Sequence, residues 1–336
     1  MTAVVTPPPR EEGRVPRFAI AMPAYNAAST IAETIESALA QTYQDWELAI
    51  VDDGSRDDTA DVALAAAAGD PRIRVLRQSN MGCGPARGVA VGLTTGTYVC
   101  RLDADDLYLP HYLESMSCFI DEHPGFDIYS CNGERFYPDG HRELARPVEE
   151  GANGPRSWAL DDMLRDNMIF SMAVFTRDIF DRIGGFRLGV DVEDYDFWLR
   201  AMMAGAKHIY NPAVLSLYRV GPQQMTASTV SLMTHQIAVL QEAADALTRT
   251  SARRTIALAT IRRLRGDIGV RRRAALDERL ALGDKAHARV DFLAARYGYS
   301  SSAKYVAAGA VMMVSPSLYA RAFVRSVGSS PREGGK

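Results

Sequence analysis

The chain has 336 residues, 47% of them hydrophobic and 24% charged, which are values of a globular protein with a sizeable core. No stretch reaches the roughly 18 apolar residues that a membrane-spanning helix needs, so we expect no such helix. The net charge of −3 is unevenly spread. Residues 1–219 hold 20 Lys and Arg against 33 Asp and Glu, whereas residues 220–336 hold 18 against 8. We therefore expect an acidic domain and a basic region suited to an anionic surface.

Both ends of the chain are predicted to be disordered. Residues 1–16 contain three consecutive prolines and several charges without an apolar core, which indicates a leader rather than a signal peptide. Residues 328–336 are small and charged. The four cysteines form no C-x-x-C pair, which favours reduced thiols in a cytoplasmic protein over a disulfide or zinc framework.

Strands and helices alternate through the first part of the chain. Apolar runs of strand length predict buried strands at residues 18–22, 46–51, 73–76 and 97–102. Helical spacing predicts helices at residues 30–39, 57–68, 85–93 and 110–122, the first opened by a capping box at Thr30. This alternation, at about 25–30 residues per unit, predicts an α/β fold with a mostly parallel sheet flanked by helices.

The middle of the chain is less regular. Strands are predicted at residues 126–130, 170–175 and 214–218, and helices at 176–183 and 197–204. Residues 132–160 are rich in Gly, Pro and charge without periodicity, which predicts a long loop.

From residue 232 the pattern becomes helical. Residues 251–273 hold eight arginines and one acid, interleaved with apolar residues. This basic amphipathic helix is compatible with a membrane surface or with packing against the acidic domain. The solvated face of an ordinary helical hairpin is the alternative.

Three acidic clusters follow predicted strands or loops. They are Asp52-Asp53, Asp103-Ala104-Asp105-Asp106 and Glu193-Asp194. Carboxylates brought together at one edge of a sheet need a cation or a basic partner. Asp103 and Asp105 would share one side of an extended backbone, and such oxygen ligands suit Mg²⁺ or Mn²⁺ bound to substrate phosphates. An acidic turn before the next helix is the alternative, and Asx-turn chemistry is the alternative for Asp53.

Asp194 suggests a different role. Neighbouring carboxylates and the apolar residues that follow make a carboxylate more basic, which suits a general base. The alternative is that Asp194 or Asp196 caps the helix predicted to begin near Phe197.

The loop Gly82-Cys83-Gly84-Pro85-Ala86-Arg87-Gly88 invites comparison with a dinucleotide fingerprint. Its spacing is G-x-G-x-x-x-G, and it follows the third predicted strand, so we do not expect a dinucleotide-dependent oxidoreductase. A loop that leads into a helix still offers backbone N–H groups, and Arg87 a cation, to a nucleotide.

Taken together, the motifs resemble those of family 2 glycosyltransferases. The residues that carry the resemblance are Pro23-Ala24-Tyr25-Asn26, Gln41-Thr42-Tyr43, Glu47-Leu48, Val51-Asp52-Asp53-Gly54-Ser55, the loop 80–87, Leu102-Asp103-Ala104-Asp105-Asp106 and Glu193-Asp194-Tyr195-Asp196-Phe197-Trp198. They cover about residues 17–220. The resemblance implies a GT-A (Rossmann-like) fold over residues 17–222. It also implies an inverting, metal-dependent transfer from a nucleotide-activated sugar. The helical spacing and basic composition described above predict a basic helical region at 223–327.

The resemblance also implies roles for individual residues in binding the donor. Pro23, Ala24 and Tyr25 would line the pocket of a uracil or thymine base, and Asp53 would contact that base. The donor would thus be a UDP- or dTDP-sugar.

Further roles carried over from the family concern the charged centre. Arg87 would face the nucleotide, and Asp103 and Ala104 would lie against it. Asp105, with Asp103, would hold Mn²⁺ or Mg²⁺. Asp194 would deprotonate the acceptor hydroxyl, with Glu193 beside it.

The sequence departs from the family pattern after Tyr218-Arg219, where many members carry a histidine that contacts metal or phosphate and this chain has none. Arg219 or Gln223 are the candidates to replace it. The Gln-x-x-Arg-Trp signature of processive members is also absent, so we expect transfer of a single sugar.

The expected partners are a nucleotide-sugar donor and a hydroxyl acceptor, either a lipid-linked glycan or a small molecule, in cell-envelope polysaccharide or glycolipid synthesis. We expect a cytoplasmic protein, peripheral at the inner face of the membrane through the basic helices, and no nucleic-acid partner. The alternatives are a non-catalytic nucleotide-sugar-binding subunit and a sugar-1-phosphate nucleotidyltransferase.

Overall fold

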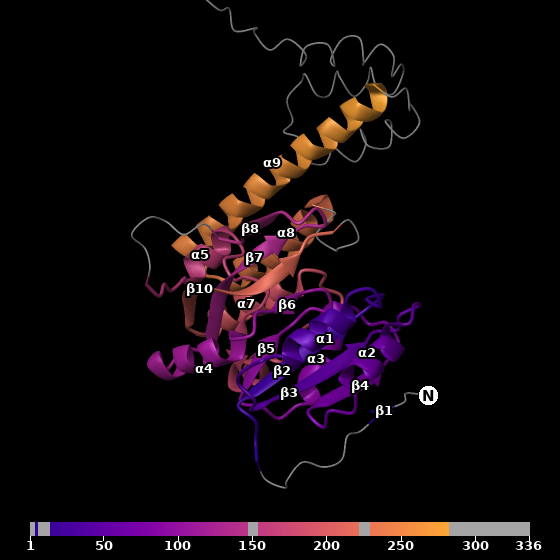
Figure 1. Cartoon of the computed structure of the whole chain (residues 1–336). Helices are drawn as coiled ribbons and strands as arrows, with labels where there is room; N and C mark the ends of the chain where they lie inside the picture. The colour runs from indigo at the N-terminus through magenta and orange to yellow at the C-terminus, as the bar shows by residue number, and fades with distance from the viewer. Residues whose placement is uncertain (1–3, 6–13, 147–153, 222–228, 282–336) are drawn as a thin grey trace, which may run out of the picture. The chain divides into compact units, whose positions relative to one another are not determined.

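A computed structural model describes residues 4–5, 14–146, 154–221 and 229–281 (Figure 1). The predicted tail, residues 282–327 of the basic region, Gln223 and most of the predicted leader lie outside the described residues. Within the leader, Val4–Val5 forms a short strand, β1. The described residues fall into two compact units, one with residues up to 221 and 245–256, the other with 229–244 and 257–281. Across these ranges, no helix has both the length and the apolar character needed to cross a bilayer.

The first unit is built on a parallel sheet core. Strands β2 (Phe18–Ala24), β3 (Trp46–Asp52), β4 (Ile73–Arg77) and β5 (Tyr98–Arg101) pair in the order β4-β3-β2-β5, all parallel. Helices α1 (Ile31–Leu39), α2 (Thr59–Ala67) and α3 (Cys83–Gly92) connect them. Every residue of β2 and β3 is buried, because helices cover the faces of such a sheet. The predicted alternation is confirmed here.

The other half of the sheet is mixed rather than parallel. Strand β9 (Val174–Thr176) lies antiparallel between β5 and β7 (Ile128–Phe136), and β10 (His208–Arg219) runs parallel to β7. Strand β6 (Leu107–Tyr108) pairs antiparallel with β10. Parallel pairing is therefore found in β4-β3-β2-β5 and in β7-β10, and the prediction of a mostly parallel sheet missed the antiparallel strands β9 and β6. The chain reaches β9 through an excursion instead of a helical crossover, so the strand direction reverses.

The remaining described elements complete the two units. They are α4 (Tyr112–Glu122), β8 (Arg142–Leu144), α5 (Leu160–Arg165), α6 (Arg177–Ile183), α7 (Glu193–Met203), α8 (Thr229–Ala246) and α9 (Ala252–Ala281).

Three local predictions differ from the structure. The predicted loop at 132–160 contains the end of β7 and its antiparallel partner β8, whose residues are all exposed and so lack an apolar pattern. Helix α7 begins at Glu193, not near Phe197, and its N-cap is Val192. Acidic residues in its first turn favour the helix through the macrodipole. At α1 the Thr30 side chain caps no N–H group.

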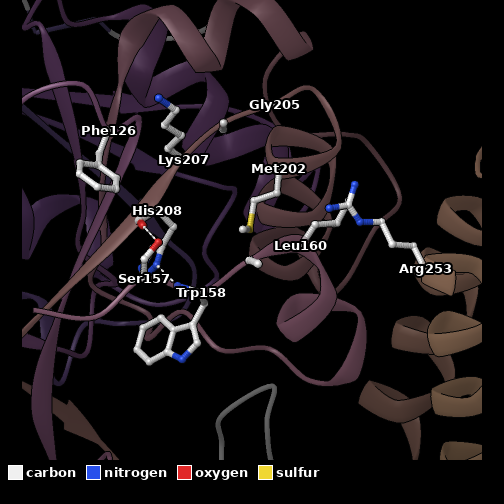
Figure 2. Close-up of a pocket in the computed structure, with 11 residues that line it drawn as sticks. Phe126, Ser157, Trp158, Leu160, Met202, Gly205, Lys207, His208 and Arg253 are labelled. Atoms are coloured by element: carbon white, nitrogen blue, oxygen red, sulfur yellow. Dashed lines mark hydrogen bonds between the residues drawn. The ribbon is translucent and has the colours of Figure 1, made fainter. Parts of the chain in front are cut away.

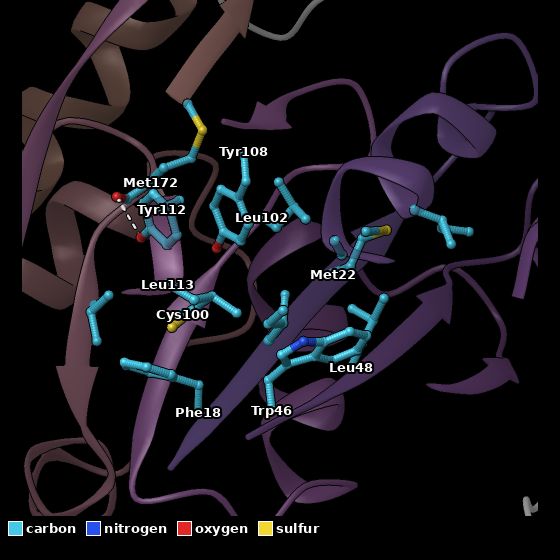
Figure 3. Packing of buried hydrophobic residues seen from close by; sticks show 14 of the residues in the cluster. Phe18, Met22, Trp46, Leu48, Cys100, Leu102, Tyr108, Tyr112, Leu113 and Met172 are labelled. Carbon is cyan, nitrogen blue, oxygen red and sulfur yellow. Dashed lines mark hydrogen bonds between the residues drawn. The ribbon is translucent and has the colours of Figure 1, made fainter. Parts of the chain in front are cut away.

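The hydrophobic core fixes the strand ends that lead to the acidic residues (Figure 3). The rings of Tyr108 and Tyr112 stack with centroids 3.8 Å apart. The Tyr108 hydroxyl donates to the Arg101 carbonyl at 2.6 Å, and the Tyr112 hydroxyl donates to the Met172 carbonyl at 3.1 Å. These bonds hold the end of β5 from within the core. All four cysteines are free thiols, as expected, and Cys100 is among the buried ones.

Candidate functional site

The predicted site residues gather at the carboxyl edge of the parallel strands. Because β2, β3 and β5 run in the same direction, Ala24, Asp53 and Asp103 leave the sheet at the same edge. The Asp53 N–H donates to the Ala24 carbonyl at 2.8 Å and ties the first two strand ends together. The carboxyl edge of an open α/β sheet is where such folds bind ligands.

The residues 103–106 form a turn at this edge. The Asp106 N–H donates to the Asp103 carbonyl at 3.1 Å, so Asp103 and Asp105 do not lie on the extended backbone that the sequence suggested. Instead, the hydroxyls of Thr30 and Thr34 both donate to the Ala104 carbonyl, at 2.9 and 3.0 Å. Helix α1 therefore positions the turn, and Ala104 is buried against it.

Asp103 lies at the boundary between protein and solvent, with 26% of its side chain exposed. Its Oδ1 pairs with the Arg87 guanidinium, and its Oδ2 accepts a hydrogen bond from the Ser171 hydroxyl at 3.0 Å. Burial alone would raise the pKa of Asp103, but the nearby guanidinium groups of Arg87 and Arg101 outweigh it and hold the pKa at about 2. Asp103 is therefore ionised at neutral pH.

Arg87 is fully buried on α3. In addition to Asp103, its Nη2 lies 3.3 Å from Glu193 Oε1 and 3.4 Å from the Cys83 sulfur. The resemblance implied that Arg87 faces the nucleotide. That role stays a prediction. In the structure the Arg87 guanidinium pairs with the carboxylates of Asp103 and Glu193, because a buried charge needs charged partners.

Arg101 is a second buried cation, which the sequence analysis did not single out. Its side chain points from β5 to α7, where Nη2 lies 3.1 Å from Glu193 Oε1 and Nη1 lies 3.8 Å from Asp194 Oδ2. Glu193 thus lies between two guanidinium groups. Burial, and then the charge of Asp194, raise the pKa of Glu193, while Arg101 and Arg87 oppose the rise.

Asp194 is more accessible than Glu193, with 26% of its side chain exposed. Its Oδ2 accepts a hydrogen bond from Asn167 Nδ2 at 3.2 Å, and its Oδ1 accepts one from the Tyr195 N–H at 2.6 Å. Asp196, the other candidate cap, is buried and pairs with Arg187 and Arg200. Asp103 and Asp194 are thus the two partly exposed ends of the chain Asp103–Arg87–Glu193–Arg101–Asp194, which we call the charge chain.

Asp53 organises the neighbouring loop. Its carboxylate accepts hydrogen bonds from Gln78 Nε2 at 2.8 Å and from the N–H groups of Met81 and Gly82 at 2.9 and 2.8 Å. Only 2% of Asp53 is exposed, whereas Tyr25 beyond the end of β2 is 47% exposed. Pro23 and Ala24 are buried at the strand end. The predicted contacts of these residues with a base stay predictions.

Arg219, one of the two candidates to replace the histidine expected after it, lies beside the acidic turn. Its N–H donates to Asp106 Oδ1 and its Nε donates to the Asp105 carbonyl, both at 2.9 Å. Asp106 is fully buried, and burial, together with the charges of Asp105 and Asp103, raises its pKa well above the usual value. Arg219 therefore anchors the turn from the side of β10.

The residues at the turn fit a divalent cation. Asp103 and Asp105 are carboxylates with hard oxygen donors, and Mg²⁺ commonly takes only one or two carboxylates, its other ligands being water and substrate phosphate. Within the residues whose placement is described, no group of three or more His, Cys, Asp and Glu side chains forms a complete metal site. This donor set is of the type that is completed by a phosphate ligand.

A separate pocket lies at the amino ends of β7 and β10, which is the sheet edge opposite the charge chain. Its volume is about 360 Å³, and Trp158, Met202 and His208 are among its lining residues (Figure 2). The Trp158 ring stacks on His208 with centroids 4.9 Å apart. None of the predicted site residues lines this pocket.

Comparison with known proteins bears directly on these observations. Residues 19–184 match the family model described as glycosyl transferase family 2. The chain carries a family 2 glycosyltransferase domain. A chondroitin synthase from Escherichia coli is 32% identical over 211 residues, which are 58% of this chain and 28% of the synthase. The chain spans only 20–28% of the length of the first three curated relatives.

Solved structures confirm the GT-A fold of the family 2 domain. TarS of S. aureus, residues 1–349 in complex with UDP-GlcNAc, superimposes with a TM-score of 0.59 at 18% identity, over 74% of this chain and 72% of that chain. The mannosyltransferase PcManGT from Pyrobaculum calidifontis, in complex with GDP-Man and Mn²⁺, gives a TM-score of 0.58 at 20% identity, over 94% of this chain and 87% of that chain.

Proposed function

We propose that the family 2 domain is an inverting, metal-dependent glycosyltransferase that moves a single sugar from a nucleotide-diphosphate sugar to an acceptor hydroxyl. The charge chain is the observation that carries this proposal. It links Asp103 of the acidic turn to Asp194 on α7, so that a donor diphosphate at the turn and an acceptor at Asp194 would share one edge of the sheet.

The acidic turn would bind the donor. Asp105 and Asp103 would hold Mn²⁺ or Mg²⁺, which would neutralise the charge that develops on the departing diphosphate. TarS and PcManGT were solved with UDP-GlcNAc and with GDP-Man and Mn²⁺, which supports a nucleotide-sugar donor for this fold. We propose UDP or dTDP as the nucleotide, with Asp53 and Tyr25 at the base.

Asp194 would act as the general base. Its carboxylate would accept the proton of the acceptor hydroxyl as the hydroxyl oxygen forms a bond to the anomeric carbon. The bond from that carbon to the diphosphate oxygen breaks on the opposite face, and its electron pair leaves with the diphosphate. This in-line displacement inverts the anomeric centre. Arg101, 3.8 Å from Asp194, and Asn167 would hold the base in position.

The acceptor would be a lipid-linked glycan or a small molecule in cell-envelope polysaccharide or glycolipid synthesis. We place the enzyme in the cytoplasm, at the inner face of the membrane, where the hydroxyl of a lipid-linked acceptor would be presented. The basic composition of residues 220–336 supports this location.

Two measurements test the proposed function. The first is thermal stability with UDP, dTDP, GDP or CDP, each with Mn²⁺ or with a chelator. A ligand at about 100 times its Kd adds about 2.7 kcal/mol to stability, and we expect this only for one pyrimidine diphosphate with metal. The second measurement is release of nucleoside diphosphate from the matching nucleotide sugar.

For the second measurement, Asp194→Asn should retain donor binding and lose roughly 10²–10⁴-fold in rate, the usual contribution of a general base. Asp178→Asn is the control, because its carboxylate is 79% exposed on α6. Near-normal turnover by Asp194→Asn would refute the role of Asp194. Binding without any release of nucleoside diphosphate by the wild type would instead indicate a nucleotide-sugar-binding subunit.

A further inference from the structure

Helix α9 has one buried apolar side. Ala257, Ile261, Leu264 and Ile268 follow one another at intervals of four, three and four residues, so they lie on one face of the helix. All four are at most 7% exposed. The apolar side of this helix, for which the sequence left a membrane surface and packing against protein both open, is therefore buried within the protein.

The exposed part of α9 carries a cluster of arginines. Arg262, Arg263 and Arg265 are exposed, and we call these three residues the arginine face. Residues 252–273 contain one acid, Asp267, which lies 3.8 Å from Arg263. The side chains of Arg263 and Asp267 are 53% and 46% exposed, so solvent screens this pair and it contributes little. The arginine face thus keeps a positive field.

The same exposures argue against insertion into a bilayer. A helix that lies in the membrane interface buries an apolar face among the acyl chains. Along residues 252–274 of α9, Val270 is the one large apolar side chain that is strongly exposed, at 69%. One valine does not supply such a face, so attraction to a membrane would depend on charge.

We propose that the arginine face of α9 binds the surface of an anionic lipid bilayer through charge alone, without insertion. The three arginines lie within about one turn of α9, which is a continuous helix of 30 residues (Figure 1), so they place three cations close together for lipid phosphates. Charge complementarity with lipid phosphates carries this choice, and a short DNA duplex is the competing polyanion that the test below includes. This surface adds a partner to the proposed transferase.

The test is co-sedimentation of the full chain with lipid vesicles. We expect binding to phosphatidylcholine vesicles that contain phosphatidylglycerol and none to phosphatidylcholine alone. Salt should release the protein, because the Debye length falls to about 3 Å at 1 M ionic strength. Each arginine near an anionic surface contributes about a five-fold change in affinity, so the triple variant R262Q/R263Q/R265Q should bind on the order of 100-fold more weakly.

A matched variant controls for net charge. R14Q/R142Q/R182Q removes the same charge from exposed arginines of the first unit, and we expect it to bind vesicles like the wild type. Thermal unfolding of each variant verifies that it folds. The salt titration uses the wild type alone, so it tests the proposal even where a variant fails to fold.

Several results would overturn the inference. These are equal loss of binding in both triple variants, unchanged binding in R262Q/R263Q/R265Q, and binding that only detergent reverses. Tighter binding of a short DNA duplex than of the vesicles would identify a different partner. Vesicle binding requires no sugar transfer. Absence of vesicle binding would therefore not refute the proposed transferase reaction, and absence of sugar transfer would not refute vesicle binding.

Discussion

Replacing Arg101 by methionine tests whether the charge chain holds the site together. The substitution keeps an unbranched side chain in β5 and removes a cation that is 3% exposed and 3.1 Å from Glu193. Removing one partner of a buried ion pair costs about 3–5 kcal/mol, because the other charge stays buried. Arg87 remains 3.3 Å from Glu193, so we expect a loss near about 3 kcal/mol, the lower end of that range.

The loss can be measured by urea and thermal unfolding. For a domain of this size, a loss of about 3 kcal/mol lowers the Tm by roughly 6–12 °C. Arg182→Met is the control, since that arginine is 45% exposed and its ion pairs are worth at most about 1 kcal/mol. The double variant R101M/E193Q should be more stable than the sum of the two single changes predicts, because it removes both charges.

The pH dependence of R101M gives a further check. The pKa of Glu193 is raised in the folded state, so the folded chain binds a proton more readily than the unfolded chain and loses stability as the pH rises. Without Arg101 this effect should grow, and the deficit of R101M should be larger at about pH 8 than at about pH 5. A deficit below about 0.5 kcal/mol, or strict additivity in the double variant, would refute the pairing.

Three further outcomes are expected. Burial, and then the charge of Arg146, lower the pKa of His208 to about 3, so between about pH 6.5 and pH 3 only the unfolded chain binds a proton at this residue. The free energy of unfolding, measured with urea, should therefore fall by about 2 kcal/mol at about pH 5, and a His208→Gln variant should lack this fall. Gly133→Ala should destabilise by about 1–3 kcal/mol, because its Cβ would lie 2.6 Å from the Phe170 ring, whereas Gly154→Ala meets nothing within 4 Å and should be neutral. Asp53→Ala should lower the free energy of unfolding by about 1–3 kcal/mol and speed proteolysis of the loop 78–82, because the Asp53 carboxylate accepts three hydrogen bonds from that loop. Unchanged resistance of this loop to protease would contradict the prediction.

The parallel half of the sheet and the edge of the site could be predicted from the sequence for a simple reason. Strands β2 and β3 are continuous apolar runs that helices cover on both faces, and such runs are visible without knowing their partners. Asp53 and Asp103 follow strands of equal direction, so they reach the same edge. In these stretches, the residues that look buried in the sequence are buried in the structure, and the acidic residues that follow them lie at the sheet edge.

The rest of the site depends on contacts between residues far apart in the sequence. Arg101 is a charged residue within an apolar run, and its partner Glu193 lies 92 residues later, so no local pattern shows the pairing. The start of α7 differs from the prediction for a related reason: its acidic residues are typical of a helix cap, but in the structure they form the first helical turn. The exposed hairpin of β7 and β8 has no apolar alternation to reveal it.

The charge chain also separates the assembly of the site from its chemistry. Carboxylates that gather at one edge repel each other, and in many metal sites the bound ion supplies the cohesion, so that folding and metal binding become one event. Here the guanidinium groups of Arg87 and Arg101 supply it from inside the protein. These buried ion pairs do not require a bound metal, so the acidic residues at this edge can keep their positions before any ligand binds.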